Sequence, residues 1–236
     1  MADGSVLLIT GASSGIGAET ARQAAAAGYR LVLAARREEE IQRLADELGG
    51  EERARAVRCD VTEWDDVEKL AASALEAFGA IDAVYANAGF GATRGFMEES
   101  PEQWRAMVLT NVLGVAYTIR ATLPHVLERG TGHYLITSSV AGRRALPGSL
   151  YSATKHAATA MGEALRAELR QMRDNHRIRV TVIEPGMVDT PFFDNRPGPD
   201  RALEDADVGR AVLYALSQPE HVDVNEILLR PTPQST

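Results

Sequence analysis

The stretch "TGASSGIG" at residues 10–17 follows the apolar run "SVLLI" at residues 5–9 directly and precedes an alanine-rich segment. Its three glycines, Gly11, Gly15 and Gly17, have the spacing G-x-x-x-G-x-G. Glycines between a strand and a helix let the backbone approach a pyrophosphate, whose charge is met by the amides of the helix N-terminus. This order of strand, glycines and helix predicts a dinucleotide-binding turn, although three glycines also suit a tight turn without a ligand.

The rest of the chain alternates short apolar runs with long helical patterns, which is typical of repeated βαβ units. Several runs are apolar throughout, as strands are when helices cover both faces of a parallel sheet. We therefore predict an α/β fold: a Rossmann-like, doubly wound three-layer α/β/α sandwich with a seven-stranded parallel sheet, in one domain over residues 1–236. The expected strands are Val6–Thr10, Arg30–Ala35, Ala54–Arg58, Ile81–Ala86, His133–Thr137, Arg179–Glu184 and Glu226–Leu229.

Composition narrows the classes of partner. The formal charge of −8 argues against a surface that binds nucleic acid or anionic lipid, since both require an excess of Lys and Arg. The N-terminal apolar run is too short for a signal peptide or a membrane span. Cys59 is the only cysteine, which rules out an intrachain disulfide, and the five histidines lack metal-site spacing. We expect a cytoplasmic protein without a metal cofactor.

Six motifs occur in an order that identifies the chain as similar to one known family. Together they resemble the short-chain dehydrogenases/reductases over nearly the whole chain, with one small departure at Ala86, where many members carry asparagine. The resemblance implies an oxidoreductase that transfers a hydride between a nicotinamide dinucleotide and a carbonyl or secondary alcohol. The motifs are "TGASSGIG", "CDVT" at Cys59–Thr62, "NAG" at Asn87–Gly89, "NVLG" at Asn111–Gly114, "YSATK" at Tyr151–Lys155 and "PGMVDT" at Pro185–Thr190.

The same resemblance assigns the residues that would hold the cofactor. In it, Asp60 meets the adenine, while Val188 and Thr190 face the nicotinamide carboxamide. The residues implied are Gly11, Ser13, Ser14, Gly15, Ile16, Gly17, Asp60, Val61, Asn87, Ala88, Gly89, Tyr151, Lys155, Pro185, Gly186, Val188 and Thr190.

The end of the second predicted strand indicates which nicotinamide dinucleotide is used. An acidic residue about twenty positions beyond the glycines would bind the ribose 2′-hydroxyl of NAD. Ala35 stands there instead, followed by Arg36 and Arg37. A guanidinium can pair with a 2′-phosphate through charge-assisted hydrogen bonds, so the sequence favours NADP(H). The alternative is that these arginines are solvated residues at the start of the next helix.

Tyr151 and Lys155 are four residues apart at the start of a helical pattern, so their side chains share one face. A phenol ionises near pH ~10, and a neighbouring ammonium favours the phenolate by ~1–3 units, toward a useful range for acid–base catalysis. Such a pair is common by chance and gains significance only from the ordered motifs. We predict that Tyr151 is the general acid and base and that Lys155 lowers its pKa; the resemblance implies that Lys155 also binds the cofactor ribose.

Two further polar residues complete the predicted catalytic set. Ser138 precedes Tyr151 by thirteen residues, the spacing of the family's catalytic serine, and would orient the substrate oxygen, with Ser139 as the alternative. Asn111 is a poor helix former within a helical stretch. The resemblance makes it the residue that kinks this helix and holds a proton-relay water behind Lys155; a helix cap is the other interpretation.

The substrate is much less clear from the sequence. The ending "VNEILLRPTPQ" resembles a subgroup of NADP-dependent dehydrogenases that includes enzymes acting on 3-hydroxy acids, which suggests a small 3-hydroxy or 3-oxo acid. Arg143 or Arg144, which follow the predicted catalytic serine, would pair with its carboxylate; the alternative is that both arginines are simply solvated. The proline-rich stretch at residues 190–204 suggests a loop over the site, or else a plain surface connector. Candidate lining residues are Gly91, Thr93, Ala141, Arg143, Arg144, Met187, Phe192 and Phe193.

Two other functional classes use a nucleotide-binding fold of this type. A catalytically idle NADP(H)-binding regulatory or scaffold protein would share this fold, because fold does not fix function. The related sugar-nucleotide epimerases need more sequence after the sixth strand than the fifty or so residues present here. The resemblance also implies a homotetramer or homodimer built on helices around Asn111–Leu127 and Tyr151–Met172.

Overall fold

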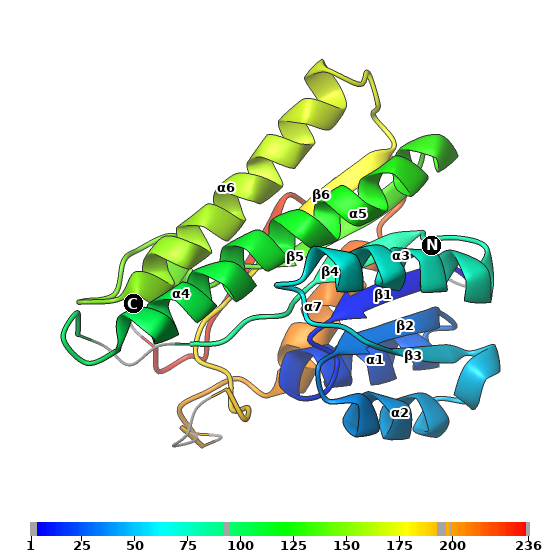
Figure 1. Cartoon of the computed structure of the whole chain (residues 1–236). Helices are drawn as coiled ribbons and strands as arrows, with labels where there is room; N and C mark the ends of the chain where they lie inside the picture. The colour runs from blue at the N-terminus through cyan, green and yellow to red at the C-terminus, as the bar shows by residue number, and fades with distance from the viewer. Residues whose placement is uncertain (1–3, 92–94, 193–196, 199, 235–236) are drawn as a thin grey trace.

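Seven strands form one parallel sheet in the order β3-β2-β1-β4-β5-β6-β7 (Figure 1). The computed structural model describes residues 4–91, 95–192, 197–198 and 200–234. The Rossmann-like α/β prediction is therefore confirmed. The strands are β1 (Val6–Thr10), β2 (Arg30–Ala35), β3 (Ala54–Arg58), β4 (Ala83–Ala86), β5 (Gly132–Thr137), β6 (Ile178–Pro185) and β7 (Glu226–Leu229).

Strand β4 begins two residues later than predicted. Asp82 uses its carboxylate to accept a hydrogen bond from the Val6 amide at 2.8 Å, while its own amide donates to the Val6 carbonyl at 3.0 Å. These contacts join Asp82 to the first residue of β1. Regular pairing between β4 and β1 then begins at Ala83.

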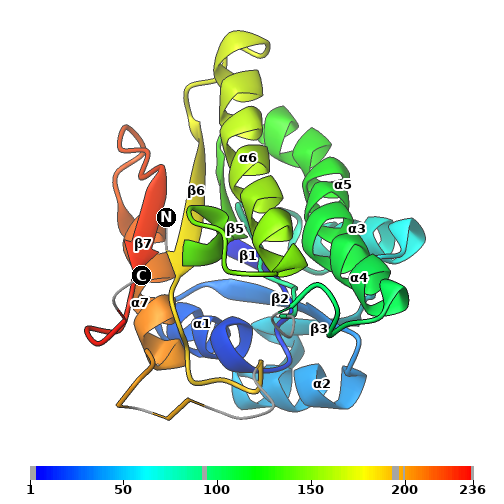
Figure 2. The ribbon, with the colours of Figure 1, turned by 90° about the vertical axis from the view of Figure 1, so that its left-hand side faces the viewer.

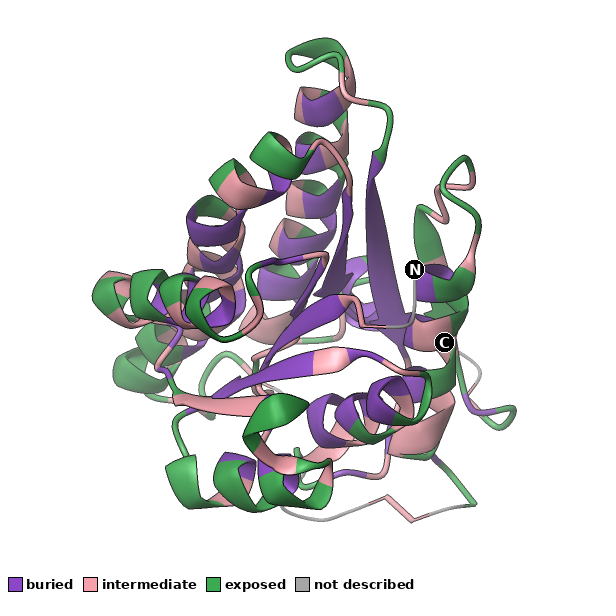
Figure 3. Ribbon diagram, turned by 90° about the vertical axis from the view of Figure 1, so that its right-hand side faces the viewer, coloured by how far each residue is buried: buried purple, intermediate pink, exposed green. Residues whose placement is uncertain are grey.

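Helices cover both faces of the sheet because successive strand residues point to opposite sides. Leu7 and Ile9 of β1 pack in one core with α1, α2 and α7, while Val6 and Leu8 pack in the other with α3, α5 and α6. Figure 2 shows the two layers and Figure 3 the buried strands between them. The helices are α1 (Gly15–Ala26), α2 (Glu38–Glu47), α3 (Trp64–Phe78), α4 (Pro101–Val108), α5 (Gly114–Arg129), α6 (Leu150–Gln171) and α7 (Asp205–Ser217), with short turns η1 (Gly50–Glu52) and η3 (Val140–Gly142).

A π-helical turn, η2 (Leu109–Leu113), joins α4 to α5 in one continuous helical run. By length and composition alone, Pro101–Arg129 could cross a membrane. In the fold, however, its Val115, Ala121 and Val126 are buried in the core against the sheet. The run is thus part of one helical layer of the sandwich. Within its most apolar 18-residue stretch, 39% is buried inside the protein.

The strand order places β1 between β2 and β4, so successive crossovers leave β1 in opposite directions. In open α/β sheets, ligands bind outside the carboxyl ends of the strands at this reversal. The reversal therefore directs attention to the loops after β1 and β4.

Candidate active site

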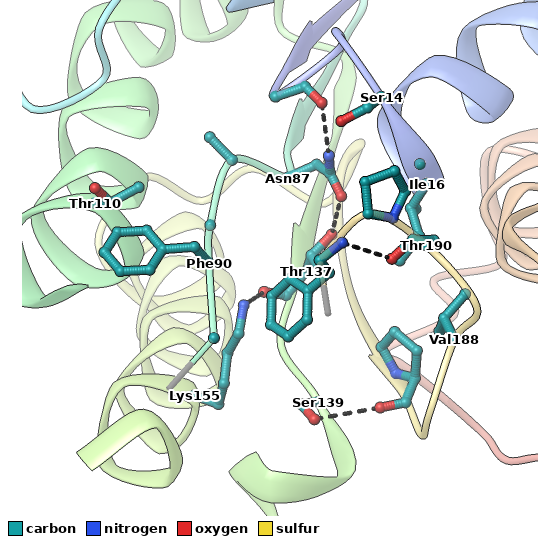
Figure 4. Close-up of a pocket in the computed structure, with 18 of the residues that line it drawn as sticks. Ser14, Ile16, Asn87, Phe90, Thr110, Thr137, Ser139, Lys155, Val188 and Thr190 are labelled. Carbon is teal, nitrogen blue, oxygen red and sulfur yellow. Dashed lines mark hydrogen bonds between the residues drawn. The ribbon is translucent and has the colours of Figure 1, made fainter. Parts of the chain in front are cut away.

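A cavity of about 600 Å³ lies over the carboxyl ends of β1, β4, β5 and β6 (Figure 4). It brings together residues from five of the six sequence motifs, all except Asn111–Gly114. Of the residues predicted to hold a cofactor, those that line it are Gly11, Ser13, Ser14, Gly15, Ile16, Arg36, Arg37, Asp60, Val61, Asn87, Ala88, Gly89, Tyr151, Lys155, Pro185, Gly186, Val188 and Thr190.

The glycine turn owes its shape to backbone geometry that other residues adopt poorly. Gly11 has φ +69° and Gly15 φ +53°, both in the left-handed region. Gly17 does not line the cavity, in contrast to the prediction: a Cβ there would lie 2.3 Å from the Gly11 carbonyl oxygen. Gly17 instead lets α1 start close against the turn, which leaves the first amides of the helix directed at the cavity.

Asn87 ties three strand ends together at the base of the cavity. Its side-chain amide donates to the Thr10 carbonyl at 3.2 Å, and its Oδ1 accepts from the Thr137 hydroxyl at 3.0 Å. The Thr10 hydroxyl in turn accepts a hydrogen bond from the Asn87 backbone amide at 3.1 Å. The ends of β1, β4 and β5 are thereby fixed relative to one another, and with them the loops that carry the site.

The outer end of the cavity carries positive charge. The Arg37 guanidinium donates to the Ser13 hydroxyl at 2.8 Å and to the Ser14 hydroxyl at 2.7 Å, which fastens it to the glycine turn. Arg36 lines the same region. At the adjacent wall, Asp60 accepts hydrogen bonds from the amide and hydroxyl of Thr62 at 3.0 and 2.9 Å. A phosphate placed here would meet two guanidinium groups and two hydroxyls.

Tyr151 and Lys155 project from the first turns of α6 toward the inner end of the cavity. Ser149 caps this helix by accepting the Ser152 amide at 3.3 Å. Lys155 Nζ donates to the Thr137 carbonyl at 2.9 Å (Figure 4) and lies 5.6 Å from the centroid of the Tyr151 ring. The carbonyl thus orients the ammonium alongside the phenol.

The pKa values of these two groups are set mainly by burial. Burial raises the pKa of Tyr151 to about 12, opposed by a hydrogen bond from Ser139, and lowers the pKa of Lys155 to about 8. The sequence led us to expect a lowered tyrosine pKa. In the protein alone the desolvation of the phenol outweighs the opposing effect of Ser139, so the phenol is protonated at neutral pH.

Ser138 and Ser139 are turned to different sides of β5. Both serines line the cavity, but the Ser138 hydroxyl is directed toward α6, where it donates to the Lys155 carbonyl at 2.9 Å and is hydrogen-bonded to Thr159 at 2.7 Å. The Ser139 hydroxyl faces Tyr151, where it opposes the rise in the pKa of the phenol, and donates to the Pro185 carbonyl at 3.3 Å. The geometry therefore does not give Ser138 its predicted role beside the substrate oxygen, because successive residues of an extended chain point to opposite sides.

Asn111 lies in the π-helical turn, fully enclosed and outside the cavity lining. Its side-chain amide donates to the Phe90 carbonyl at 2.9 Å and to the Thr154 hydroxyl at 3.1 Å, and its Oδ1 accepts the Phe90 amide at 3.0 Å. The predicted irregularity in the helix is a widened turn, a feature often found at functional sites. Asn111 thereby links the loop after β4 to α6.

On the side of Tyr151, the cavity wall is mainly apolar. The Phe192 ring packs edge-on to Tyr151, with 5.9 Å between ring centroids. It also lies over Gly91, where a Cβ would come within 2.5 Å of the Phe192 ring. Met187 and Leu146 add to this wall. Phe193 and Thr93 lie outside the described residues.

The two arginines predicted to pair with a substrate carboxylate do not line the cavity. Arg143 Nε donates to Glu184 at 2.6 Å, and its Nη2 pairs with Glu226. Arg144 is exposed, and Ala141 is buried away from the lining. Arg143 directly follows η3, and its side chain is paired with glutamates of β6 and β7. The sequence pattern did not predict these partners.

Gln234, near the C-terminus, is a site residue that the sequence reasoning missed. Its side-chain oxygen accepts the Met187 amide at 2.9 Å, and a Cβ on Gly186 would lie 2.2 Å from that oxygen. Beside it, Leu203 is joined to the backbone of Met187 and Asp189 by hydrogen bonds of 2.9 and 2.8 Å. A lone glutamine after the last strand offers no local signal of this long-range contact.

Comparison with known proteins decides the family. The sequence pattern of the family described as short chain dehydrogenase matches residues 5–199. The chain belongs to this family. Among curated relatives, an uncharacterized oxidoreductase of Staphylococcus aureus (strain MRSA252) is 37% identical over 228 residues, which is 96% of each chain.

Several solved dehydrogenase structures share the whole fold. An alcohol dehydrogenase from the archaeon Thermococcus sibiricus, complexed with 5-hydroxy-NADP, is 34% identical with a TM-score of 0.87, covering 99% of both chains. A serine dehydrogenase complexed with NADP+ is 31% identical with a TM-score of 0.90, covering 98% of this chain and 96% of that one. A member from Burkholderia phymatum in complex with NAD is 31% identical with a TM-score of 0.83, covering 96% and 89%. The chain is thus an oxidoreductase of a family whose solved members bind nicotinamide dinucleotides.

Proposed function

We propose that this short-chain dehydrogenase is an NADP(H)-dependent enzyme that interconverts a carbonyl compound and a secondary alcohol. The observation that carries the proposal is the convergence of Tyr151, Ser139 and Lys155 in one cavity with the glycine turn. The phenol is protonated at neutral pH, as a general acid for carbonyl reduction must be. A buried lysine behind it, held by the Thr137 carbonyl, supplies charge where phenolate develops.

In this proposal the chain's own residues hold the substrate oxygen and move a proton. Ser139 donates to the carbonyl oxygen, and Tyr151 gives that oxygen its proton during reduction and takes it back during oxidation. The nicotinamide, when bound, supplies or accepts the hydride. Lys155 stabilises the phenolate and binds the cofactor ribose. Asn111 supports a relay water behind Lys155 through its main-chain carbonyl, since its side chain is held by Phe90 and Thr154.

The donor set of the cavity fits a dinucleotide. The glycine turn and the first amides of α1 suit a pyrophosphate, and Arg36 with Arg37 suits a 2′-phosphate. Because Ala35 provides no carboxylate for a 2′-hydroxyl, we infer a preference for NADP(H) over NAD(H). Among the described residues, no cluster of three or more His, Cys, Asp or Glu side chains forms a metal site.

For the substrate we infer an uncharged carbonyl compound with an apolar substituent. Phe192, Met187 and Leu146 form the described wall beside Tyr151. Arg143, the residue that would have selected a small 3-oxo acid, is paired with two glutamates. The solved serine dehydrogenases keep hydroxy acids such as L-serine in the set of compounds to be compared.

A panel of carbonyl compounds, followed by NADPH absorbance, tests this proposal. We expect turnover of alkyl or aryl ketones and aldehydes, with kcat/KM higher for NADPH than for NADH. The reverse reaction should favour uncharged alcohols over L-serine and 3-hydroxybutyrate. Tight NADPH binding without turnover of any compound would instead support an idle binding protein.

We also propose that the enzyme is a cytoplasmic homo-oligomer, a homodimer or homotetramer. The helical run Pro101–Arg129 is strongly apolar but only partly buried, and Val108 remains 40% exposed. A second copy packed on this face and on α6 would cover such a surface. Light scattering on the purified protein should give a mass that is two or four times that of the chain; a monomeric mass would contradict it.

A further inference from the structure

Glu184, the penultimate residue of β6, is a fully buried carboxylate directly beside the active-site cavity. Its Oε1 accepts hydrogen bonds from Arg143 Nε at 2.6 Å and from the Thr159 hydroxyl at 3.2 Å. Its Oε2 is buried and accepts no hydrogen bond from the part of the chain that the structure describes. A buried charge is costly, and an apolar residue would pack here with less penalty, so the carboxylate calls for a reason beyond stability.

Glu184 contacts residues in two segments at the inner end of the cavity, the turn η3 and the helix α6. Arg143 directly follows η3, the turn entered through Ser139. Thr159 lies one helical turn after Lys155 on α6 and is joined to the Lys155 carbonyl through the Ser138 hydroxyl, by bonds of 2.7 and 2.9 Å.

The chain neighbour of Glu184 completes this arrangement. Pro185 follows it directly, and the Pro185 carbonyl accepts the Ser139 hydroxyl at 3.3 Å. The Ser139 hydroxyl is therefore bounded by Tyr151 on one side and by the end of β6 on the other. A shift of η3 relative to β6 would alter both contacts.

We propose that Glu184, paired with Arg143, is a positioning residue that holds η3 against β6 and α6 so that the Ser139 hydroxyl is directed at Tyr151. The proposal rests on the role given to Ser139 in the proposed function. Arg143 is anchored a second time by Glu226 of β7, which keeps its guanidinium over the end of β6. Because the pair is outside the cavity lining, it acts on the geometry of the hydroxyl and leaves cofactor binding unchanged.

The test is a double-mutant cycle between Glu184 and Ser139 in the full-length enzyme. E184Q keeps the size of the side chain and an acceptor for Thr159 but removes the charge that holds Arg143. We expect E184Q to lower kcat on the order of 10- to 100-fold, as misplacement of a reacting group does, with the Kd for NADPH within about twofold of wild type. In the S139A background, E184Q should change kcat by less than about twofold, because its effect passes through Ser139.

A matched control removes the charge of another carboxylate that is paired with an arginine, at the opposite end of the strands. Asp82 accepts the Val6 amide at 2.8 Å and an Arg129 hydrogen bond at 2.6 Å, before the start of β4. D82N should lower the melting temperature yet leave kcat unchanged. If E184Q fails to fold, T159V replaces it in the same cycle, since it removes a hydroxyl bonded to both Glu184 and Ser138.

Each outcome decides the proposal. An E184Q enzyme with wild-type kcat, or an equal loss of kcat with and without Ser139, would overturn the positioning role while the proposed function stands on the active wild type. A wild type that turns over no carbonyl compound would overturn the proposed function and this inference together. A loss of NADPH binding in E184Q would show a general structural defect and would also overturn it.

Discussion

The Ser139 hydroxyl faces the phenol of Tyr151 and opposes the rise in its pKa, whereas the hydroxyl of the preceding Ser138 is directed toward α6 and bonded to Thr159 at 2.7 Å. This difference in direction is the basis for our proposal that Ser139, and not Ser138, donates to the substrate oxygen.

Substitution of each serine by alanine should therefore have unequal effects. We expect S139A to lower kcat by on the order of 10²–10³, the usual cost of removing one donor to a developing oxyanion. S138A should lower stability by about 1 kcal/mol through its lost hydrogen bonds and change kcat much less. Steady-state kinetics and thermal unfolding of both variants measure this. A larger loss of kcat in S138A would return the role to Ser138.

Cofactor preference should depend on the positive end of the cavity. In an A35D/R36Q/R37Q variant, a carboxylate can accept the 2′-hydroxyl of NADH and no guanidinium remains for a 2′-phosphate. The ratio of kcat/KM for NADPH to that for NADH should then reverse. The single variants R36Q and R37Q show which arginine contributes more. An unchanged ratio in the triple variant would contradict the assignment of NADP(H).

The pH dependence should reflect the buried phenol. With its pKa raised to about 12 by burial, Tyr151 is the protonated acid that reduction needs at neutral pH, while oxidation needs the phenolate and should speed up as pH rises. Replacement of Lys155 by methionine removes the ammonium that favours phenolate, so the rise in oxidation rate should move to higher pH by about 1 unit or more. A profile that does not move would remove Lys155 from this role.

Gln234 should matter for the loop that follows β6. In Q234A, the Met187 amide, which belongs to a lining residue of the cavity, loses its acceptor. We expect KM for the carbonyl substrate to rise about 5- to 10-fold, equivalent to about 1 kcal/mol, with a smaller change in kcat. Q234E retains an acceptor oxygen and should restore much of the KM. Equal KM values in wild type and Q234A would exclude this contribution.

Patterns that are local in the chain predicted most of the fold. Apolar runs such as Arg30–Ala35 and the glycine turn at residues 10–17 carry their own signals, because a strand buried on both faces must be apolar and a tight turn needs glycine. Strand ends were less predictable: the start of β4 depends on the Asp82 contact with Val6, which is 76 residues away in the chain.

The site was predictable where a motif fixes a residue and less so where direction matters. Tyr151 and Lys155 share a helix face by spacing alone, and both line the cavity. Ser138 and Ser139 could not be separated by counting residues, since the path of η3 decides which hydroxyl faces Tyr151. Arg143 likewise was assigned to a substrate because its partners, Glu184 and Glu226, lie on strands far along the chain.

The most direct test of the catalytic assignment is carbonyl-dependent NADPH oxidation by Tyr151→Phe next to wild type, with NADPH binding measured on the same samples. We expect the variant to bind NADPH within about twofold of wild type and to lose turnover by on the order of 10³ or more, since a proton donor contributes about 10²–10⁴. Turnover within tenfold of wild type, with binding intact, would contradict the role of Tyr151 as the proton donor.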